Sequence, residues 1–141
     1  MRRYTVLVAV STAVVLGAAV GANGAAVSLQ PSLIGSYNVV LHFTTPASYA
    51  GTQTAFEQID TFNPKTGALS GLGAVQEIGG RFAFTGTVKG NAVRFFVVGP
   101  SDTAINLGRI ARDGTISGTL TCQTGTGVTI TGTFVMTPVV S

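Results

Sequence analysis

Residues 81–98 read RFAFTGTVKGNAVRFFVV, and this stretch decides the fold because apolar and polar side chains alternate along it. Before the turn, every second residue is apolar or glycine: Phe82, Phe84, Gly86 and Val88. A repeat of two residues is typical of a β-strand that buries one face. The turn Lys89-Gly90-Asn91 then joins two such segments, which predicts an antiparallel hairpin.

The same alternation continues on both sides of this hairpin, and no window has helical periodicity. Turn-forming residues separate the segments, as in Asn63–Gly67 and Arg112–Gly114. In one segment Ile59 and Phe62 are three residues apart, so the alternation slips and a β-bulge is predicted. The sequence therefore predicts strands at 36–43, 54–62, 68–75, 81–88, 92–98, 104–111, 115–122 and 128–137.

These strands are predicted to form an all-β domain, a single eight-stranded antiparallel up-and-down barrel over residues 35–138. Short turns make sequential strands antiparallel neighbours, and an open sheet without covering helices would leave two exposed edges. Glycines at 71, 86, 118 and 132 each follow an inward apolar residue by two positions. Such glycines relieve crowding where strands bend, and we expect them to leave room for large side chains from across the lumen.

The repeated hairpin resembles those of avidin-type and lipocalin-type barrels. The segments that carry the resemblance are GALSG at 67–71, DGTISGT at 113–119 and TGTF at 131–134. They are more closely similar to a loose group of small exported bacterial proteins of no settled function. The chain has no Trp, although tryptophans wall the avidin-type biotin pocket, and it lacks the Gly-x-Trp signature of lipocalins. The resemblance therefore implies a barrel, and it assigns biotin binding to no residue here.

The N-terminal segment has the order of a secretory signal peptide. Arg2 and Arg3 precede an uncharged apolar run at 6–20, and small residues follow it. Cleavage is expected after Ala22 or Gly24. A retained membrane anchor is the alternative, because the run approaches the roughly 20 residues needed to span a bilayer. The predicted division is signal peptide 1–24, linker 25–34 and barrel 35–138.

Composition and charge limit the partners of the exported protein. The 141 residues are only 9% charged, and their mean hydropathy is +0.48. Without Arg2 and Arg3, six basic residues remain against five acidic ones. The basic residues stand singly along strands and turns, whereas phosphate backbones need several cations on one face. We therefore expect no nucleic-acid partner, a secreted or cell-envelope location, and no stable membrane insertion after cleavage.

The stock of catalytic and metal-binding groups is small, with one His, one Cys and five carboxylates. Glu57 and Asp60, the nearest acidic pair, are expected on opposite faces of their strand and are interpreted as solvated surface charges. Cys122 is in phase with apolar residues and is predicted to be a buried thiol. His42 is expected on the polar face of its strand. No catalytic residue, metal or cofactor is predicted, and a non-catalytic role is favoured over a barrel-type enzyme.

The longer loops, 44–53, 76–80, 99–103 and 123–127, are expected to gather at one end of the barrel and to form its mouth. One hypothesis is a small apolar ligand bound there, under a lid in the longest loop. The alternative is a structural or interaction protein whose filled barrel holds no ligand, because eight strands enclose a lumen just wide enough for side chains. No oligomeric state is predicted. The candidate ligand-binding residues are Phe43, Tyr49, Phe56, Phe82, Asn106, Cys122 and Ile130.

The signal-peptide interpretation makes a direct prediction about the exported protein. N-terminal sequencing of secreted material should begin at Asn23 or Ala25, because small residues precede both cleavage points. An intact Met1 in a membrane fraction would instead show that the N-terminal segment is retained as an anchor.

Overall fold

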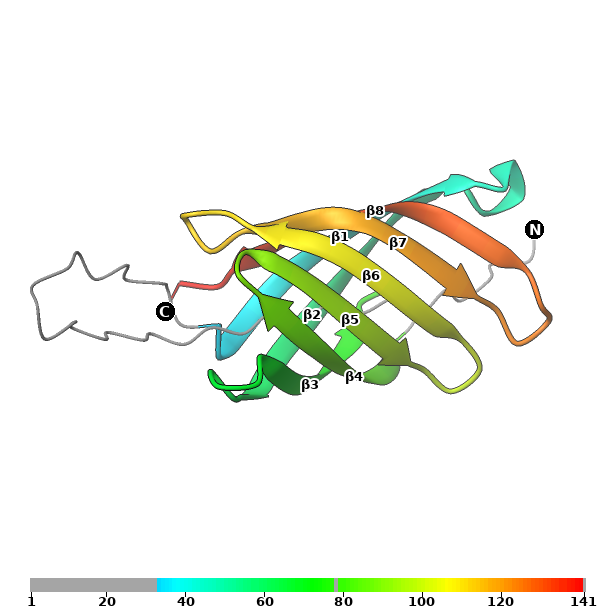
Figure 1. Cartoon of the computed structure of the whole chain (residues 1–141). Helices are drawn as coiled ribbons and strands as arrows, with labels where there is room; N and C mark the ends of the chain where they lie inside the picture. The colour runs from blue at the N-terminus through cyan, green and yellow to red at the C-terminus, as the bar shows by residue number, and fades with distance from the viewer. Residues whose placement is uncertain (1–32, 78, 141) are drawn as a thin grey trace, which may run out of the picture.

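The protein is described here from a computed structural model, which covers residues 33–77 and 79–140 (Figure 1). The predicted signal peptide and most of the linker lie outside these residues. The described part consists of β-strands and one short 3-10 helix. The elements are β1 (Gly35–Thr45), η1 (Ala47–Tyr49), β2 (Gly51–Phe62), β3 (Ala68–Val75), β4 (Gly80–Lys89), β5 (Ala92–Val98), β6 (Thr103–Ile110), β7 (Ile116–Gln123) and β8 (Thr129–Pro138).

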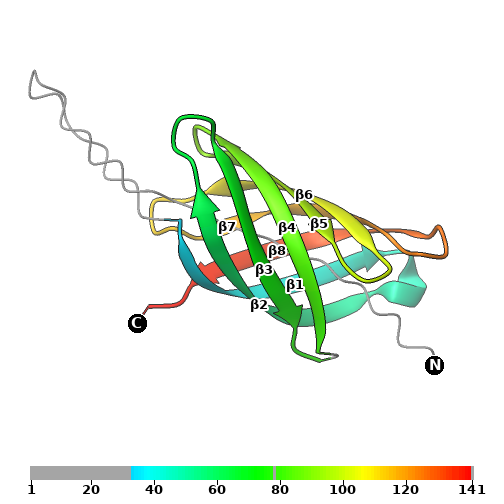
Figure 2. The ribbon, with the colours of Figure 1, turned by 90° about the horizontal axis from the view of Figure 1, so that it is seen from below.

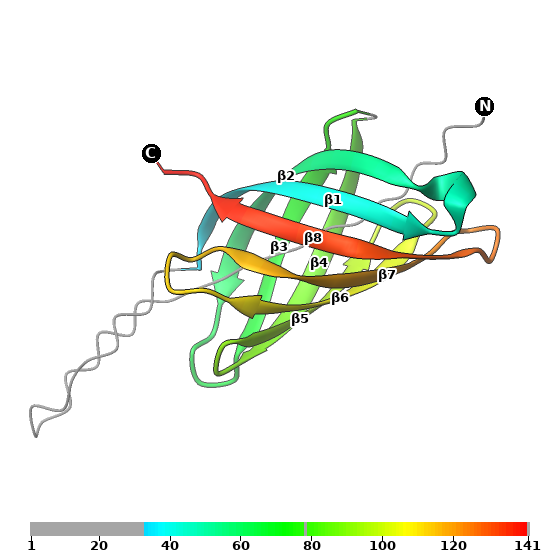
Figure 3. The same cartoon turned by 90° about the horizontal axis from the view of Figure 1, so that it is seen from above.

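The eight strands form a closed antiparallel barrel in which each strand pairs with its neighbours in sequence. The last strand returns to the first: Leu41 of β1 pairs with Phe134 of β8, and Figure 3 shows the two strands side by side. On its other edge β1 pairs with β2. Closure satisfies the backbone groups that an open sheet would expose at its edges. The predicted all-β up-and-down barrel is confirmed.

The local irregularity predicted in the second strand is also confirmed. The register between β2 and β3 shifts between Ile59 and Thr61, as expected for a β-bulge. Before the shift, Ile59 is fully buried, and after it Phe62 is half-buried against the core. The bulge therefore lets two residues three positions apart face the same side of the sheet.

Aromatic rings cover several of the inward-facing glycines, and most of these rings come from the strand directly alongside. Phe84 pairs with Gly71, Phe82 with Gly73 and Phe95 with Gly86. A Cβ built on any of the three glycines would collide with the ring of its partner. The sequence-based expectation that side chains would reach the glycines from across the lumen is therefore wrong at these pairs. A ring lying over glycine supplies the apolar contact that the strand lacks at that point.

Two glycines lie opposite each other where Gly118 of β7 pairs with Gly108 of β6. A Cβ on Gly118 would lie 2.6 Å from the Gly108 Cα and would collide with the Leu107 carbonyl oxygen. Both obstacles are backbone atoms, which cannot move aside without breaking the sheet. Gly118 is therefore required by the spacing of β6 and β7.

The two ends of the barrel differ in their connections (Figures 1 and 2). The short turns after β2, β4 and β6 lie at one end, together with the start of β1 and the end of β8. The connections after β1, β3, β5 and β7 lie at the other end, which is the predicted mouth. Among the described residues, no helix has the length and apolarity that crossing a membrane requires.

The packing around Gly118 predicts an asymmetry between neighbouring positions on β7. Gly118→Val should lower the free energy of unfolding by about 1 to 3 kcal/mol or more, because the new side chain collides with backbone. Thr119→Val, on the exposed face, should change it by no more than about 0.5 kcal/mol. Urea denaturation of both variants measures the difference, and equal losses would contradict the assignment of inner and outer faces.

Candidate functional site: the lumen and its mouth

Five of the predicted site residues face the lumen. Phe43, Phe82, Cys122 and Ile130 are buried, and they lie on the halves of their strands that lead to the mouth. Asn106 is fully buried and lies further along β6 from the mouth, where it pairs with Leu120 of β7. The inward orientation predicted for these five residues is confirmed, although they do not form one ring.

The inward orientation predicted for Phe56 is wrong. Its side chain is 43% exposed on the outer face of β2, where Phe56 pairs with Ala74 of β3. The reason is the phase of the strand: Ile59 faces the core, so alternation counted back from it turns Glu57 and Ala55 inward. The phase of β2 therefore places the Phe56 ring on the outer face, although the ring is apolar.

Glu57 consequently enters the barrel, and its interpretation as a surface charge is wrong. The residue has 0% exposure, whereas Asp60 is exposed on the opposite face as expected. The Glu57 Cγ lies 2.9 Å from the position that a Cβ would take on Gly73, and the Phe82 ring covers the same glycine. The aliphatic part of the Glu57 side chain therefore lies beside an aromatic ring. Alternation counted from Ile59 is the sequence signal that would have found it.

Polar side chains enter the lumen from opposite walls. Glu57 belongs to β2 and Asn106 to β6, four strands apart in a ring of eight. Gln53 lies on the same face of β2 as Glu57, four residues earlier and nearer the mouth, and it is half-buried. Its Oε1 accepts no hydrogen bond from the described residues. Near the other end, the Tyr37 hydroxyl donates to the Leu33 carbonyl at 2.8 Å. A few polar groups in an apolar enclosure are typical of ligand-binding sites.

Side-chain size along the lumen is graded from one end to the other. The half near the turns contains large apolar residues, whereas small ones predominate near the mouth. The large residues are Ile59, Phe84, Phe95, Ile116, Phe134 and Met136; the small ones are Ala55, Val75, Val97, Ala104 and Cys122. Phe43, Phe82 and Ile130 are the large exceptions at the mouth. Volume available to a ligand would therefore lie near the mouth.

The loops at the mouth are held to the barrel. Tyr49 of η1, the predicted lid residue, is half-buried against the core, and its N–H donates to the Pro46 carbonyl at 2.9 Å. Asp102, between β5 and β6, is buried, and its Oδ1 accepts hydrogen bonds from Ser101 Oγ and the Gly125 N–H, both at 3.2 Å. This carboxylate joins the β5–β6 and β7–β8 loops. Sequence analysis missed Asp102, because only the fold brings the two loops together.

Cys122 is a free, buried thiol, as predicted. Burial raises the pKa of Cys122 to about 12, and the negative charge of nearby Asp102 adds to the effect. At neutral pH the thiol is therefore protonated. A nucleophilic cysteine needs thiolate, so this environment opposes nucleophilic chemistry.

His42 and Cys122 lie on opposite sides of the barrel wall. The His42 ring is exposed on the outer face, and its Nδ1 lies 3.2 Å from Thr52 Oγ1. The two side chains therefore form no dyad. Within residues 33–77 and 79–140, no cluster of three or more His, Cys, Asp or Glu could hold a metal ion.

Comparison with known proteins gives no relative: no family model, curated protein or solved structure matches the chain. Of the resemblance drawn from the repeated hairpins, the structure confirms the eight-stranded antiparallel barrel, and no family is identified.

The environment of Cys122 predicts slow alkylation. Iodoacetamide at pH 8 should modify the native protein far more slowly than the urea-unfolded protein, because the folded thiol is both buried and protonated. The folded pKa lies above that of the unfolded chain, so this group's contribution to stability is complete below about pH 8.5 and is lost as the pH rises toward 12. Cys122→Ala should remove this part of the alkaline destabilisation. Rapid modification of the native wild type would contradict the buried environment.

Proposed function

We propose that this protein is an exported, non-catalytic binding barrel. Its ligand is a small, largely apolar molecule that carries an amine or another hydrogen-bond donor. The observation that carries the proposal is the burial of Glu57 and Asn106 in a lumen otherwise lined mainly by apolar side chains. The proposal of export rests on the N-terminal sequence pattern of Arg2, Arg3 and the apolar run.

The physical argument begins with the cost of a buried carboxyl group. Removing a charged or polar group from water costs several kcal/mol or more unless hydrogen bonds and charges compensate. Apolar side chains of similar volume often give equal or greater stability. A lumen that served only as a core would therefore gain little from Glu57. A ligand with a donor group provides a reason for its position.

The geometry of the mouth supports the same function. Small side chains line that half of the lumen, so the ligand's apolar part would lie among Ala104, Val97 and Phe82. Gln53 stands between the mouth and Glu57 on the same strand. The loop containing Tyr49 is the segment suited to gate exchange, because it packs on the core without a buried residue in η1.

The second candidate is a structural or interaction protein with a filled barrel. It is favoured by the packing of Phe84 on Gly71 and Phe95 on Gly86, which fills the half of the lumen near the turns. In this alternative, Glu57 contributes to the specificity of packing and no ligand is bound. The two candidates differ in whether the native protein binds an apolar probe.

Binding of two probes tests the proposal. A neutral environment-sensitive dye should bind the native protein stoichiometrically, and a long-chain alkylamine should displace it. Glu57→Gln should weaken the amine about tenfold or more while leaving the neutral dye unchanged, because a hydrogen bond to a charged group is worth about 1.5 to 3 kcal/mol. Tyr49→Ala should mainly speed dye release. Fluorescence titration and stopped-flow measurements provide these values.

Phe82→Ala and Phe56→Ala are a matched pair for the same titration. Phe82 faces the lumen, so its truncation should change dye affinity several-fold, whereas Phe56 lies on the outer face and its truncation should leave affinity unchanged. If the wild type binds no dye and Phe82→Ala lowers stability by about 3 to 5 kcal/mol, the barrel is filled and the binding function is wrong.

A further inference from the structure

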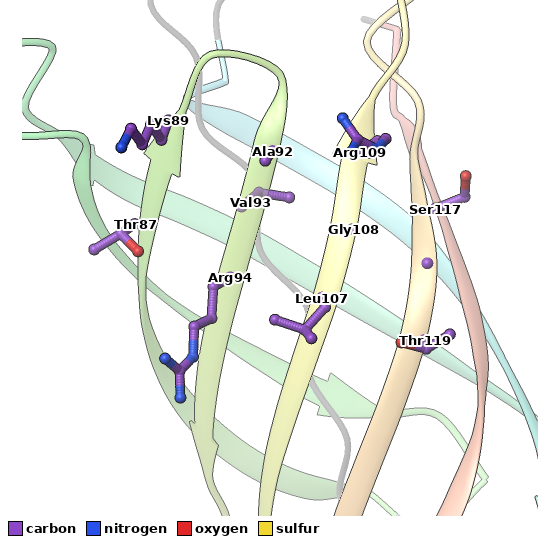
Figure 4. A pocket seen from close by; sticks show the side chains of 11 residues that line it. Thr87, Lys89, Ala92, Val93, Arg94, Leu107, Gly108, Arg109, Ser117 and Thr119 are labelled. Atoms are coloured by element: carbon purple, nitrogen blue, oxygen red, sulfur yellow. The ribbon is translucent and has the colours of Figure 1, made fainter.

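The outer wall of β4–β7 carries a basic groove that the linear sequence does not reveal. The groove has a volume of about 580 Å³ and opens on the half of the wall near the turns. Lys89 of β4, Arg94 of β5 and Arg109 of β6 contribute to its lining (Figure 4). Among the described residues that line it, none is acidic. The basic residues are therefore isolated along the sequence, as expected, but the fold brings three of them together on one wall.

Strand pairing builds the groove from two adjacent rows of outward side chains. Ala92 lies between Lys89 and Arg109, and this small side chain leaves the centre of the groove hollow. Arg94 and Leu107 are direct neighbours in the second row. The row nearest the turns is Lys89, Ala92, Arg109 and Ser117, and the next is Thr87, Arg94, Leu107 and Thr119.

Exposed apolar side chains continue from the groove toward the mouth. Leu107 is 52% exposed, and Phe96, one row further, is 46% exposed beside its partner Ile105. Val98 follows in the last row, paired with Ala83 of β4. The wall thus has three cations near the turns and an exposed apolar surface toward the mouth, where Arg81 of β4 adds a fourth cation. Exposed contiguous apolar surface of this kind marks interaction sites.

We propose that this wall docks the protein on an anionic lipid surface. The cations would meet lipid phosphates while Phe96 and Leu107 enter the interface between headgroups and acyl chains. The outward positions of β4–β7 carry four cations, Arg81 being the fourth, and no carboxylate. This charge pattern is complementary to an anionic membrane. Hydroxyl groups of Thr87, Ser117 and Thr119 provide further donors to phosphate oxygens.

Other occupants fit the wall less well. In a symmetric dimer the cations of one copy would face either the cations or the apolar rows of the other, and neither arrangement supplies a negative charge. A nucleic-acid duplex would contact the cations, but its phosphate backbone offers no apolar surface to the exposed apolar rows. A lipid surface offers phosphates to the cations and an apolar interface to the exposed apolar side chains.

Vesicle co-sedimentation of the purified protein tests the docking. Vesicles of equal parts phosphatidylglycerol and phosphatidylcholine should bind the wild type, and binding should weaken with added salt. A cation beside an anionic surface contributes about 1 kcal/mol, so Arg94→Gln should weaken binding about fivefold and the double variant with Arg109→Gln about 25-fold. Lys65→Gln, with the same charge change in the β2–β3 turn, should have no comparable effect.

Exposed apolar residues on opposite walls provide the second comparison. Leu107→Ser and Phe96→Ser should weaken vesicle binding at every salt concentration, whereas Val40→Ser on β1, which is 45% exposed and lies across the barrel from β5, should not. Unchanged melting temperatures would show that the variants remain folded. An N-terminal apolar segment retained on the chain would bind pure phosphatidylcholine vesicles equally in every variant, so the differences report on the wall.

Three results would overturn the proposal. Equal vesicle binding by the Arg94→Gln and Lys65→Gln variants would show that this wall does not contact the membrane. Loss of vesicle binding in millimolar inorganic phosphate at constant ionic strength would assign the groove to a free anion. If the wild type binds no vesicles but forms a dimer, and Phe96→Ser dissociates that dimer, the apolar rows contact a second copy of the chain instead. The dye titration of the lumen is independent of all three.

Discussion

Closure of eight strands around a narrow lumen is the constraint on which the rest of this structure depends. The interior of such a barrel is just wide enough for side chains, so a large inward residue needs a small one beside it. Phe84 over Gly71 and Phe82 over Gly73 meet this requirement through direct strand pairing. The bulge in β2 serves the same closure, because it brings both Ile59 and Phe62 to the core side.

The same constraint determines the chemistry of the lumen. With β2 in its observed phase, Glu57 has no outward alternative, and the aliphatic part of its side chain lies beside the wall formed by Gly73 and Phe82. Asn106 enters from the opposite wall. At the mouth, Asp102 joins two loops, and its charge also helps to keep Cys122 protonated. The polar groups therefore divide into two that lie in the lumen and one that holds the loops.

Lumen and outer wall would act together in the proposed functions. Docking through Arg94 and Leu107 would place the barrel against a membrane, where amphipathic molecules are concentrated. The lumen would then bind one such molecule by its apolar part and by its donor group near Glu57. Each proposal stands on different residues, so either can fail without the other.

The sequence by itself determined the strands, the turns and the closed barrel, because alternation and turn residues are local properties of the chain. It also placed the bulge near Ile59 and the burial of Cys122 correctly. Only the tertiary structure decided between two phases of β2: alternation counted from Ile59 turns Glu57 inward, alternation counted from Phe56 turns it outward, and the observed strand has the first. Likewise Arg109 becomes a neighbour of Lys89 and Arg94 only when β6 pairs with β5, because the longer loop between these strands does not by itself determine their register.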